Sequence, residues 1–264
     1  GPQRRLLHQL WQLGIRCSSM ERQALGRAVP PREERRGWAQ PASRVPTALK
    51  VRVIATLLWN GQTLVKGVGF DAWRPVGHPL QAINVFQMRE VDEIIFLDIT
   101  ATKEGRRPNF ALIERLAREC FVPLTVGGGV KSVEDVRDLL RAGADKVCIQ
   151  THKGVIGDAF SVFGSQALVC CVEDRDAWAW PNGAGELLYQ SVKHDGTMQG
   201  YNLQFPLVSV PVIASGGAGT YEHFVQAVEA GASAVAAGAM WLFTEQTPLE
   251  AKRYMASRGI PVRL

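Results

Sequence analysis

The sequence predicts a (β/α)8 barrel, and three observations favour this fold class. Short apolar runs alternate with amphipathic stretches from residue 51 onward, which is typical of strand–helix units repeated around a parallel sheet. Eight of the apolar runs have the length of a strand, and eight parallel strands close a barrel. An internal repeat divides this region into two similar halves, which supports the same architecture.

The strands are predicted from apolar runs bounded by glycine, proline or polar residues. They cover residues 51–58, 93–99, 122–126, 146–150, 167–173, 186–191, 210–215 and 233–237. Helical periodicity lies between several of them, at residues 79–89, 109–120, 133–142, 221–230 and 248–258.

Shortened helices are expected after the fourth, fifth and sixth strands. Residues 174–185 alone join the fifth strand to the sixth, which is near the minimum of about 10 to 12 residues for a parallel crossover. Trp178 and Trp180 are expected to cover the sheet where a helix is absent.

The repeat aligns residues 122–144 with residues 210–232 at a constant offset of 88 residues. Both copies contain a strand, a glycine pair and a helix. Ser132 and Thr220 stand at the N-cap positions of these helices, and Gly143 and Gly231 stand where a left-handed residue ends them. The third and seventh strands are therefore equivalent positions in two half-barrels.

The excess positive charge of the chain lies before the barrel. The formal net charge is +5, and residues 1–50 carry ten basic and three acidic side chains, a sum of +7. Residues 51–264 therefore sum to −2, the difference between +5 and +7, which gives no reason to expect a nucleic-acid partner. We predict a basic, disordered extension over residues 1–50 and one barrel domain over residues 51–264.

Membrane insertion, metal binding and a cofactor are not expected. No apolar stretch approaches the ~20 residues of a membrane span, and no His or Cys cluster has metal-ligand spacing. The 5 cysteines lack a C-x-x-C motif and mostly lie in apolar runs. They predict free thiols in a reducing, cytoplasmic environment.

Each half-barrel offers a site for phosphate. In both copies a glycine pair follows a strand and precedes a helix, so backbone N–H groups at the helix start can bind an anion. Two such turns half a barrel apart predict a ligand with a phosphate at each end. The residues predicted to bind phosphate are Gly128, Gly129, Gly216, Gly217 and, after the last strand, Gly238.

Catalytic groups in such a barrel belong at the carboxyl ends of the strands, which form its mouth. The acids there are Asp98, Glu173 and Asp195, and Lys66 is the nearby cation. The first strand ends in Leu58, where a facing carboxylate would be expected for acid–base catalysis.

Four charged residues mark the opposite ends of the strands, the floor of the barrel. They are Arg52, Glu93, Lys146 and Glu186, at or near the first residues of the first, second, fourth and sixth strands. Two interpretations remain open at this point. The four form structural ion pairs that close the floor, or they form a charged gate over a passage along the barrel axis.

Several motifs, in this order, resemble the cyclase subunit of imidazole glycerol phosphate synthase, the barrel partner of a glutaminase. The resemblance covers residues 51–264. It rests on Leu64-Val-Lys-Gly-Val, Asp92-Glu-Ile-Ile-Phe-Leu-Asp-Ile-Thr-Ala, Pro123-Leu-Thr-Val-Gly-Gly-Gly, Gly143-Ala-Asp-Lys-Val, Phe163-Gly-Ser-Gln-Ala, Gly183-Ala-Gly-Glu-Leu-Leu, Asp195-Gly-Thr-Met-Gln-Gly-Tyr and Ile213-Ala-Ser-Gly-Gly-Ala-Gly.

The resemblance implies that a glutaminase subunit docks on the N-terminal barrel face and that ammonia enters through a gate formed by the four floor charges. At the mouth, the family closes an imidazole ring on a doubly phosphorylated ribulosyl substrate. The products are imidazole glycerol phosphate and an aminoimidazole carboxamide ribotide. Lys66 and Asp195 match the family. Phosphate contacts match at Gly128, Thr151, Gly196 and Gly217, whereas Gln150 and Ala239 replace a usual Asn and Ser.

This chain departs from the family at two essential aspartates, which end the first and fifth strands. Leu58 and Glu173 occupy these positions here. Glutamate can transfer protons but leucine cannot, so cyclase activity should fall by several powers of ten unless another group replaces the first acid.

A sister branch resembles this chain more closely in two places. In barrel subunits associated with amidation of bacterial surface sugars, the first strand reads Leu-Leu, and Glu119-Cys-Phe-Val-Pro-Leu resembles that branch. Such a barrel receives ammonia and passes it toward a sugar amidotransferase. The related phosphoribosyl isomerase is a third possibility, but it also needs a first-strand carboxylate, so Leu58 counts against it.

Overall fold

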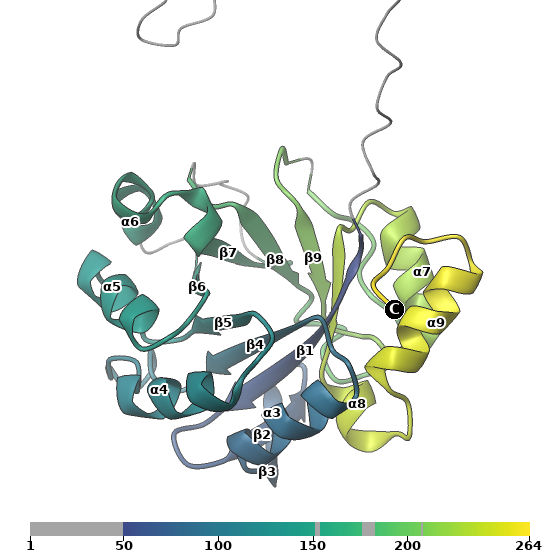
Figure 1. Cartoon of the computed structure of the whole chain (residues 1–264), viewed down its shortest axis with the longest axis horizontal. Coiled ribbons are helices and arrows are strands. Elements are labelled where there is room, and N and C mark those ends of the chain that lie inside the picture. The colour runs from purple at the N-terminus through teal and green to yellow at the C-terminus, as the bar shows by residue number, and fades with distance from the viewer. Residues whose placement is uncertain (1–49, 151–153, 176–182, 207) are drawn as a thin grey trace, which may run out of the picture. The chain divides into compact units, whose positions relative to one another are not determined.

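The computed structural model describes residues 50–150, 154–175, 183–206 and 208–264. Within them, eight parallel strands close into a barrel with helices packed around it, as predicted (Figure 1). The ring closes where the first strand pairs in parallel with the last, Arg52 opposite Ala234. In chain order the barrel strands are β1 (Arg52–Trp59), β4 (Glu93–Asp98), β5 (Leu124–Gly127), β6 (Lys146–Gln150), β7 (Leu168–Glu173), β8 (Glu186–Gln190), β9 (Val212–Ser215) and β10 (Ala234–Ala237).

Side chains of the strands alternate between two buried cores. Ile54 and Ile95 belong to a core inside the barrel, whereas Val53 and Leu57 belong to a larger core under the helices. Because the period is two, Thr56 and Leu58 share the inner face with Ile54. The sequence pattern of β1 therefore fixes which side chains can reach the lumen.

The α-helices among the described residues are α3 (Pro79–Met88), α4 (Phe110–Glu119), α5 (Val133–Arg141), α6 (Val155–Phe163), α7 (Tyr221–Glu229), α8 (Ala239–Phe243) and α9 (Pro248–Ser257). Ser132 caps α5 as predicted: its hydroxyl accepts from the Asp135 amide at 3.1 Å, and the Asp135 carboxylate accepts from the Ser132 amide at 3.0 Å. Thr220 is the N-cap of α7. Gly143 and Gly231, just beyond the helix ends, have φ of 101° and 109°, the left-handed region expected there.

A β-hairpin that the sequence reasoning did not predict follows β1. It consists of β2 (Leu64–Val68) and β3 (Asp71–Gly77), and β2 pairs antiparallel with the end of β1. The Gly69 amide donates to the Asp195 carbonyl at 2.9 Å, which ties the hairpin to the loop after β8. The hairpin thereby carries Lys66 toward the mouth.

The helical cover is uneven around the ring. The helix after β6 is as long as α5 and α7, nine residues each, so the expected shortening does not affect that helix. Within the described residues, no helix follows β7 or β8 before the next barrel strand. Part of the cover there is Phe205, whose ring packs edge-to-face on Tyr189 of β8 at 5.7 Å between centroids. Trp178 and Trp180, expected to cover this side, lie outside the described residues, as do residues 1–49.

The two ends of the barrel domain meet beside β1. Val51 forms a parallel bridge with Val262, and the Val51 amide donates to the Pro261 carbonyl at 2.7 Å. Among the described helices, none is long and apolar enough to cross a lipid bilayer.

Candidate active site

A cavity of about 530 Å³ opens at the carboxyl ends of the barrel strands. Its walls include all four predicted catalytic residues and most of the predicted phosphate-binding residues. They are Lys66, Asp98, Glu173, Asp195, Gly128, Gly129, Gln150, Gly196, Gly216, Gly217, Gly238 and Ala239. Thr151 lies outside the described residues.

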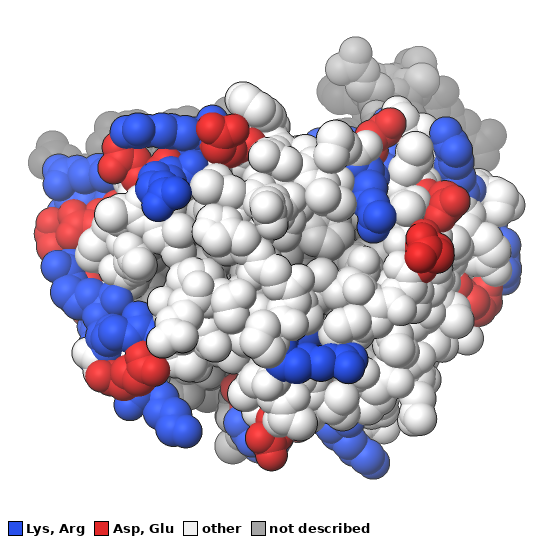
Figure 2. Space-filling model, turned by 90° about the horizontal axis from the view of Figure 1, so that it is seen from below, with Lys and Arg blue, Asp and Glu red and all other residues white. Residues whose placement is uncertain are grey.

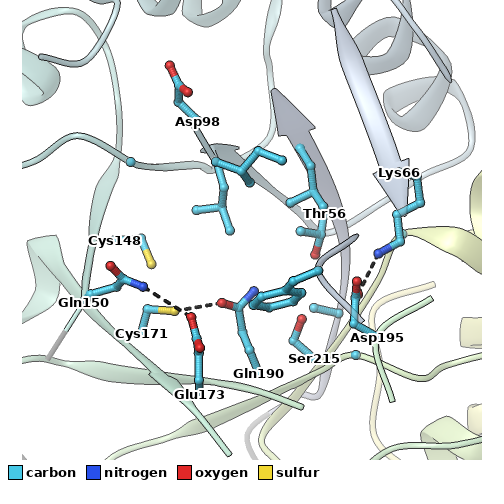
Figure 3. A pocket seen from close by; sticks show the side chains of 18 of the residues that line it. Thr56, Lys66, Asp98, Cys148, Gln150, Cys171, Glu173, Gln190, Asp195 and Ser215 are labelled. Atoms are coloured by element: carbon cyan, nitrogen blue, oxygen red, sulfur yellow. Dashed lines mark hydrogen bonds and ion pairs between the residues drawn. The ribbon is translucent and has the colours of Figure 1, made fainter. Parts of the chain in front are cut away.

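Lys66 and Asp195 form a buried ion pair on one wall of the cavity (Figure 3). The Lys66 ammonium lies 2.6 Å from Asp195 Oδ1. Asp195 lines the same cavity, and its Oδ2 is buried without a hydrogen-bond partner. Since a buried carboxylate oxygen without a partner is costly, this atom is suited to accept a hydrogen bond from a ligand.

Glu173 lies on the opposite wall, at the end of β7 (Figure 3). Gln150 Nε2 donates to its Oε1 at 3.4 Å, and Arg175 Nε donates to its Oε2 at 2.5 Å. Beside it, the Cys171 thiol donates to Gln190 Oε1 at 2.9 Å. The cavity therefore has a carboxylate on each of two facing walls, which is an arrangement suited to proton transfer on a ligand between them.

Asp98 lines the cavity but its carboxylate points away from the other labelled side chains (Figure 3). Oδ1 accepts from the Ala101 amide at 2.9 Å, and Oδ2 accepts from Arg106 at 3.1 Å. These bonds hold the turn after β4. Asp98 is therefore placed to position that turn, and Glu173 and Asp195 are better placed for proton transfer.

Leu58 occupies the inner face at the end of β1, where the sequence led us to expect an acid. Two residues earlier on the same face, Thr56 Oγ1 is buried without a hydrogen-bond partner. Thr56 was not predicted as a site residue, although the two-residue period of the strand places it below Leu58. A hydroxyl can orient a polar ligand, but its proton is not labile enough to replace a carboxylate.

Both glycine turns border the cavity, as the repeat predicts. Gly128 and Gly217 have φ of 99° and 108°, and a Cβ on either would lie within 2.1 Å of a backbone oxygen, Asp98 or Gly200 respectively. These positions accept only glycine. The Gly129 amide already donates to Thr102 Oγ1 at 3.2 Å, so an anion at this turn would compete with that hydroxyl.

The rim of the mouth carries few charges on the side of the β2–β3 hairpin. This hairpin and α8 lie at the bottom of Figure 1 and face the viewer in Figure 2, where charged side chains gather mostly at the edges. Val68, Trp73 and Phe243 are exposed apolar residues of these elements, and Arg74 lies over the Phe243 ring at 4.0 Å. Of the charged residues that line the cavity, Lys66, Asp98, Glu173 and Asp195 are buried, whereas Lys103 is exposed.

The four floor charges form one connected cluster, which we call the floor cluster: Arg52, Glu93, Lys146 and Glu186. Arg52 contacts Glu93 at 2.5 Å and Glu186 at 2.8 Å, and Lys146 contacts the same two carboxylates at 3.1 and 3.0 Å. Thr125 Oγ1 also donates to Glu93, which is only 1% exposed. Burial alone would lower the pKa of Arg52, but Glu93 and Glu186 hold it above its ordinary value.

Between the floor cluster and the mouth, the barrel lumen is lined mainly by apolar side chains. They are Ile54, Ile95, Leu97, Cys148, Val169, Cys171, Leu188, Ile213, Ala234 and Ala236. Of these, Leu97, Cys148, Cys171 and Ala236 also line the mouth cavity. Within the described part of the chain, no three His, Cys, Asp or Glu side chains gather as a metal site requires.

Polar residues of the cavity wall that were missed from the sequence include Thr56, Thr102, Lys103 and Gln190, and Asp174 was missed beside it. Gln190 ends β8 and faces the cavity, a position that the strand period alone would have indicated. Asp174 follows Glu173 directly and accepts from Ser191 at 2.6 Å. No spacing in the sequence indicates that contact.

A family model described as "Histidine biosynthesis protein" matches residues 52–182 and 178–247. The matched segments run from β1 to the end of α8 and include both glycine turns, the floor cluster and the cavity walls. They cover well over half of the chain.

Proposed function

Because this chain belongs to the histidine biosynthesis protein family, we propose that it acts as a cyclase-type barrel of the kind found in imidazole glycerol phosphate synthase. In this proposal a glutaminase docks on the floor and ammonia passes the floor cluster. The barrel mouth then binds a doubly phosphorylated ribulosyl substrate and closes the imidazole ring. The products are imidazole glycerol phosphate and an aminoimidazole carboxamide ribotide.

The observation that carries this proposal is the floor cluster at the end of the barrel opposite the cavity. Four charges share partly to fully buried positions there, with Glu93 almost without solvent contact. Replacing buried ion pairs by packed apolar residues is often neutral or stabilising, so closing the floor does not require charges. A function at the floor is therefore the better explanation, and an apolar lumen behind a charged entrance suits a small neutral molecule.

The mouth supplies groups for the chemistry. Glu173 and Asp195 are carboxylates on facing walls, and Lys66 holds one oxygen of Asp195 while leaving the other for a ligand. Ring closure needs protons to be added and removed at several atoms, which such a pair can do. The glycine turns at Gly128 and Gly217 lie on the same cavity and suit the two phosphates.

Ammonia-dependent turnover of the doubly phosphorylated ribulosyl substrate tests this proposal. We expect slow formation of imidazole glycerol phosphate by the isolated barrel with an ammonium salt, and growth of a histidine auxotroph that lacks its own cyclase subunit but has a competent glutaminase. Absence of turnover together with absence of growth would contradict the cyclase assignment.

One observation favours a second candidate function. Leu58 fills the inner face of β1, so the mouth lacks the carboxylate on which cyclase chemistry depends in the family, while the floor cluster is complete. In that case the barrel conducts ammonia from a glutaminase to a sugar amidotransferase of surface polysaccharide synthesis. A gene neighbourhood with a sugar amidotransferase and copurification with it would support this alternative, whereas a histidine operon would oppose it.

A further inference from the structure

Three side chains beside the mouth are linked in a row that the function above does not use. Ser191 Oγ lies 2.6 Å from Asp174 Oδ2 and 2.7 Å from His194 Nδ1. Ser191 is 1% exposed, so water does not compete for these contacts. The row connects the residue after β7 with the loop after β8.

The direction of hydrogen-bond donation along this row is defined. Burial alone would raise the pKa of Asp174, but hydrogen bonds from the Ser191 hydroxyl and the Val192 amide hold it below its ordinary value. Asp174 is thus ionised and only accepts. The single hydroxyl hydrogen of Ser191 is donated to Asp174, so the Ser191 oxygen must accept from His194, and Nδ1 of His194 carries a hydrogen.

We infer that Asp174, Ser191 and His194 form a positioning relay that fixes the loop carrying Asp195 and Gly196 against the second glycine turn. The loop begins with Ser191, whose amide donates to the Ser215 carbonyl of β9 at 3.0 Å and whose carbonyl accepts from the Asp195 amide at 3.0 Å. A Cβ on Gly217 would lie 2.9 Å from the His194 Cβ, so His194 packs directly on that turn.

The place of the relay in the barrel gives a reason for it. The turns after β5 and β9 are held by the capped helices α5 and α7, whereas no helix follows β7 or β8 among the described residues. Backbone groups at those two strand ends need other partners. The relay ties the ends of β7, β8 and β9 together through side chains, on the side where helices do not.

The tautomer of His194 tests the relay directly. Long-range ¹⁵N–¹H NMR of the imidazole rings at pH 8 should show that Nδ1 of His194 carries a hydrogen and Nε2 does not. The signals of His194 are assigned as those that disappear in the His194→Asn variant. Ser191→Ala should release the ring to the Nε2-protonated form. An Nε2-protonated His194 in the parent protein would overturn the relay.

The positioning role rests on the proposed phosphate site, and inorganic phosphate is the probe for it. The backbone amide signals of Gly217 and Gly128 are followed during the titration. In His194→Gln the side-chain amide lies one carbon too far out to reach Ser191. The dissociation constant of phosphate, measured at the Gly217 amide, should therefore rise about tenfold, which corresponds to the loss of roughly one hydrogen bond. His194→Asn keeps an N–H donor near the Nδ1 position and should stay within about threefold of the parent.

Gly128 is the internal control, because its affinity should not change in either variant. Equal weakening by His194→Gln and His194→Asn, or weakening at both glycines, would mean that the donor to Ser191 has no specific role and would overturn the inference. If neither glycine responds to phosphate in the parent, the phosphate sites of the proposed function fail, and the tautomer alone then decides whether the relay exists.

Discussion

Lys66 on the hairpin and Asp195 on the loop after β8 form an ion pair of 2.6 Å, although 129 residues separate them in the chain. The side chains are 5% and 13% exposed, so neither charge is well hydrated. This contact joins strand β2 to the loop after β8, although β2 and β8 do not pair in the sheet.

Lys66→Met should lower the free energy of unfolding by about 3 kcal/mol, because it leaves Asp195 buried without a counter-charge. Lys66→Met combined with Asp195→Leu should recover most of that loss. Urea denaturation measures both. The control is Arg118→Met, which removes an exposed pair with Glu114 and should cost less than about 0.5 kcal/mol. A single and a double variant of equal stability would show that the pair is not desolvated.

Leu58→Asp should raise ammonia-dependent turnover at least tenfold, at a cost in stability of about 1 to 3 kcal/mol for placing a polar group at this site. Leu58 lines the cavity opposite the wall that holds Glu173, so the new carboxylate would supply the missing acid–base group. Leu58→Asn is the matched control, since it has the same shape without an ionisable proton. Equal rates in the two variants would show that charge at this position is not what limits the reaction.

Glu93→Gln should affect turnover differently when ammonia comes from glutamine through the glutaminase and when it comes from an added ammonium salt. Glu93 accepts from Lys146, Arg52 and Thr125, so its loss leaves two floor cations sharing Glu186. Turnover by the complex with glutamine should fall more than turnover with an added ammonium salt, because added ammonia can reach the mouth from solvent. The ratio of the two rates is the measurement. Glu114→Gln, on the exposed face of α4, should leave the ratio unchanged, and a parallel fall of both rates in Glu93→Gln would argue against a gate.

His223 should make the stability of the second glycine turn depend on pH. Its Nδ1 accepts from the amides of Gly219 and Thr220 at 3.2 and 3.3 Å, which requires that this nitrogen is bare. Burial lowers the pKa of His223 below its ordinary 6.5, and Glu222 opposes this only in part. The unfolded chain therefore takes up the proton first as the pH falls.

The stabilising contribution of His223 should be complete above about pH 6.5 and should be lost as the pH falls through the lower pKa of the folded state. The free energy of unfolding measured from pH 8 to pH 5 should show this slope in the parent and not in His223→Gln. His78→Gln, which changes an exposed histidine without a side-chain cap bond, should keep the slope. A His223→Gln profile parallel to the parent would assign the slope to other groups.

The ends of the barrel strands were predicted to within two residues. A parallel strand that is buried on both faces is a short continuous apolar run, and glycine, proline or polar residues mark its ends. Residues 146–150 match β6 at both ends. The two strands that were predicted to begin two residues too early, at 122 and 210, in fact begin after Pro123 and Pro211. Proline has no N–H to donate to the ladder, and in both places the strand begins at the residue after it.

The β2–β3 hairpin and helix α6 were missed because their sequences show no clear strand or helix periodicity. The β2–β3 hairpin contains Pro75 and two non-glycine residues with positive φ, Phe70 and Ala72, and its register shifts twice, so neither period two nor a standard turn marks it. The helix α6 contains Gly157 and is apolar on most positions, which resembles a strand as much as a helix.

For the site, prediction succeeded for residues whose positions follow from the barrel fold. It failed for residues whose positions depend on the conformation of a loop. Parallel strands bring their carboxyl ends to one rim, so Glu173 and both glycine turns could be assigned to the mouth from the sequence. The bonds that hold Asp98 away from the cavity centre, and those that link Asp174 to His194, depend on loop conformations that no sequence period encodes.

The bridge between Val51 and Val262 places the beginning and the end of the barrel domain side by side. A ring of strands closed in this way has no intrinsic first member. A circularly permuted gene that joins the two ends through a short linker, and opens the chain at an exposed loop instead, would encode the same strand pairs at a small cost in loop entropy. The strand pairing of the barrel therefore does not depend on which strand comes first in the chain.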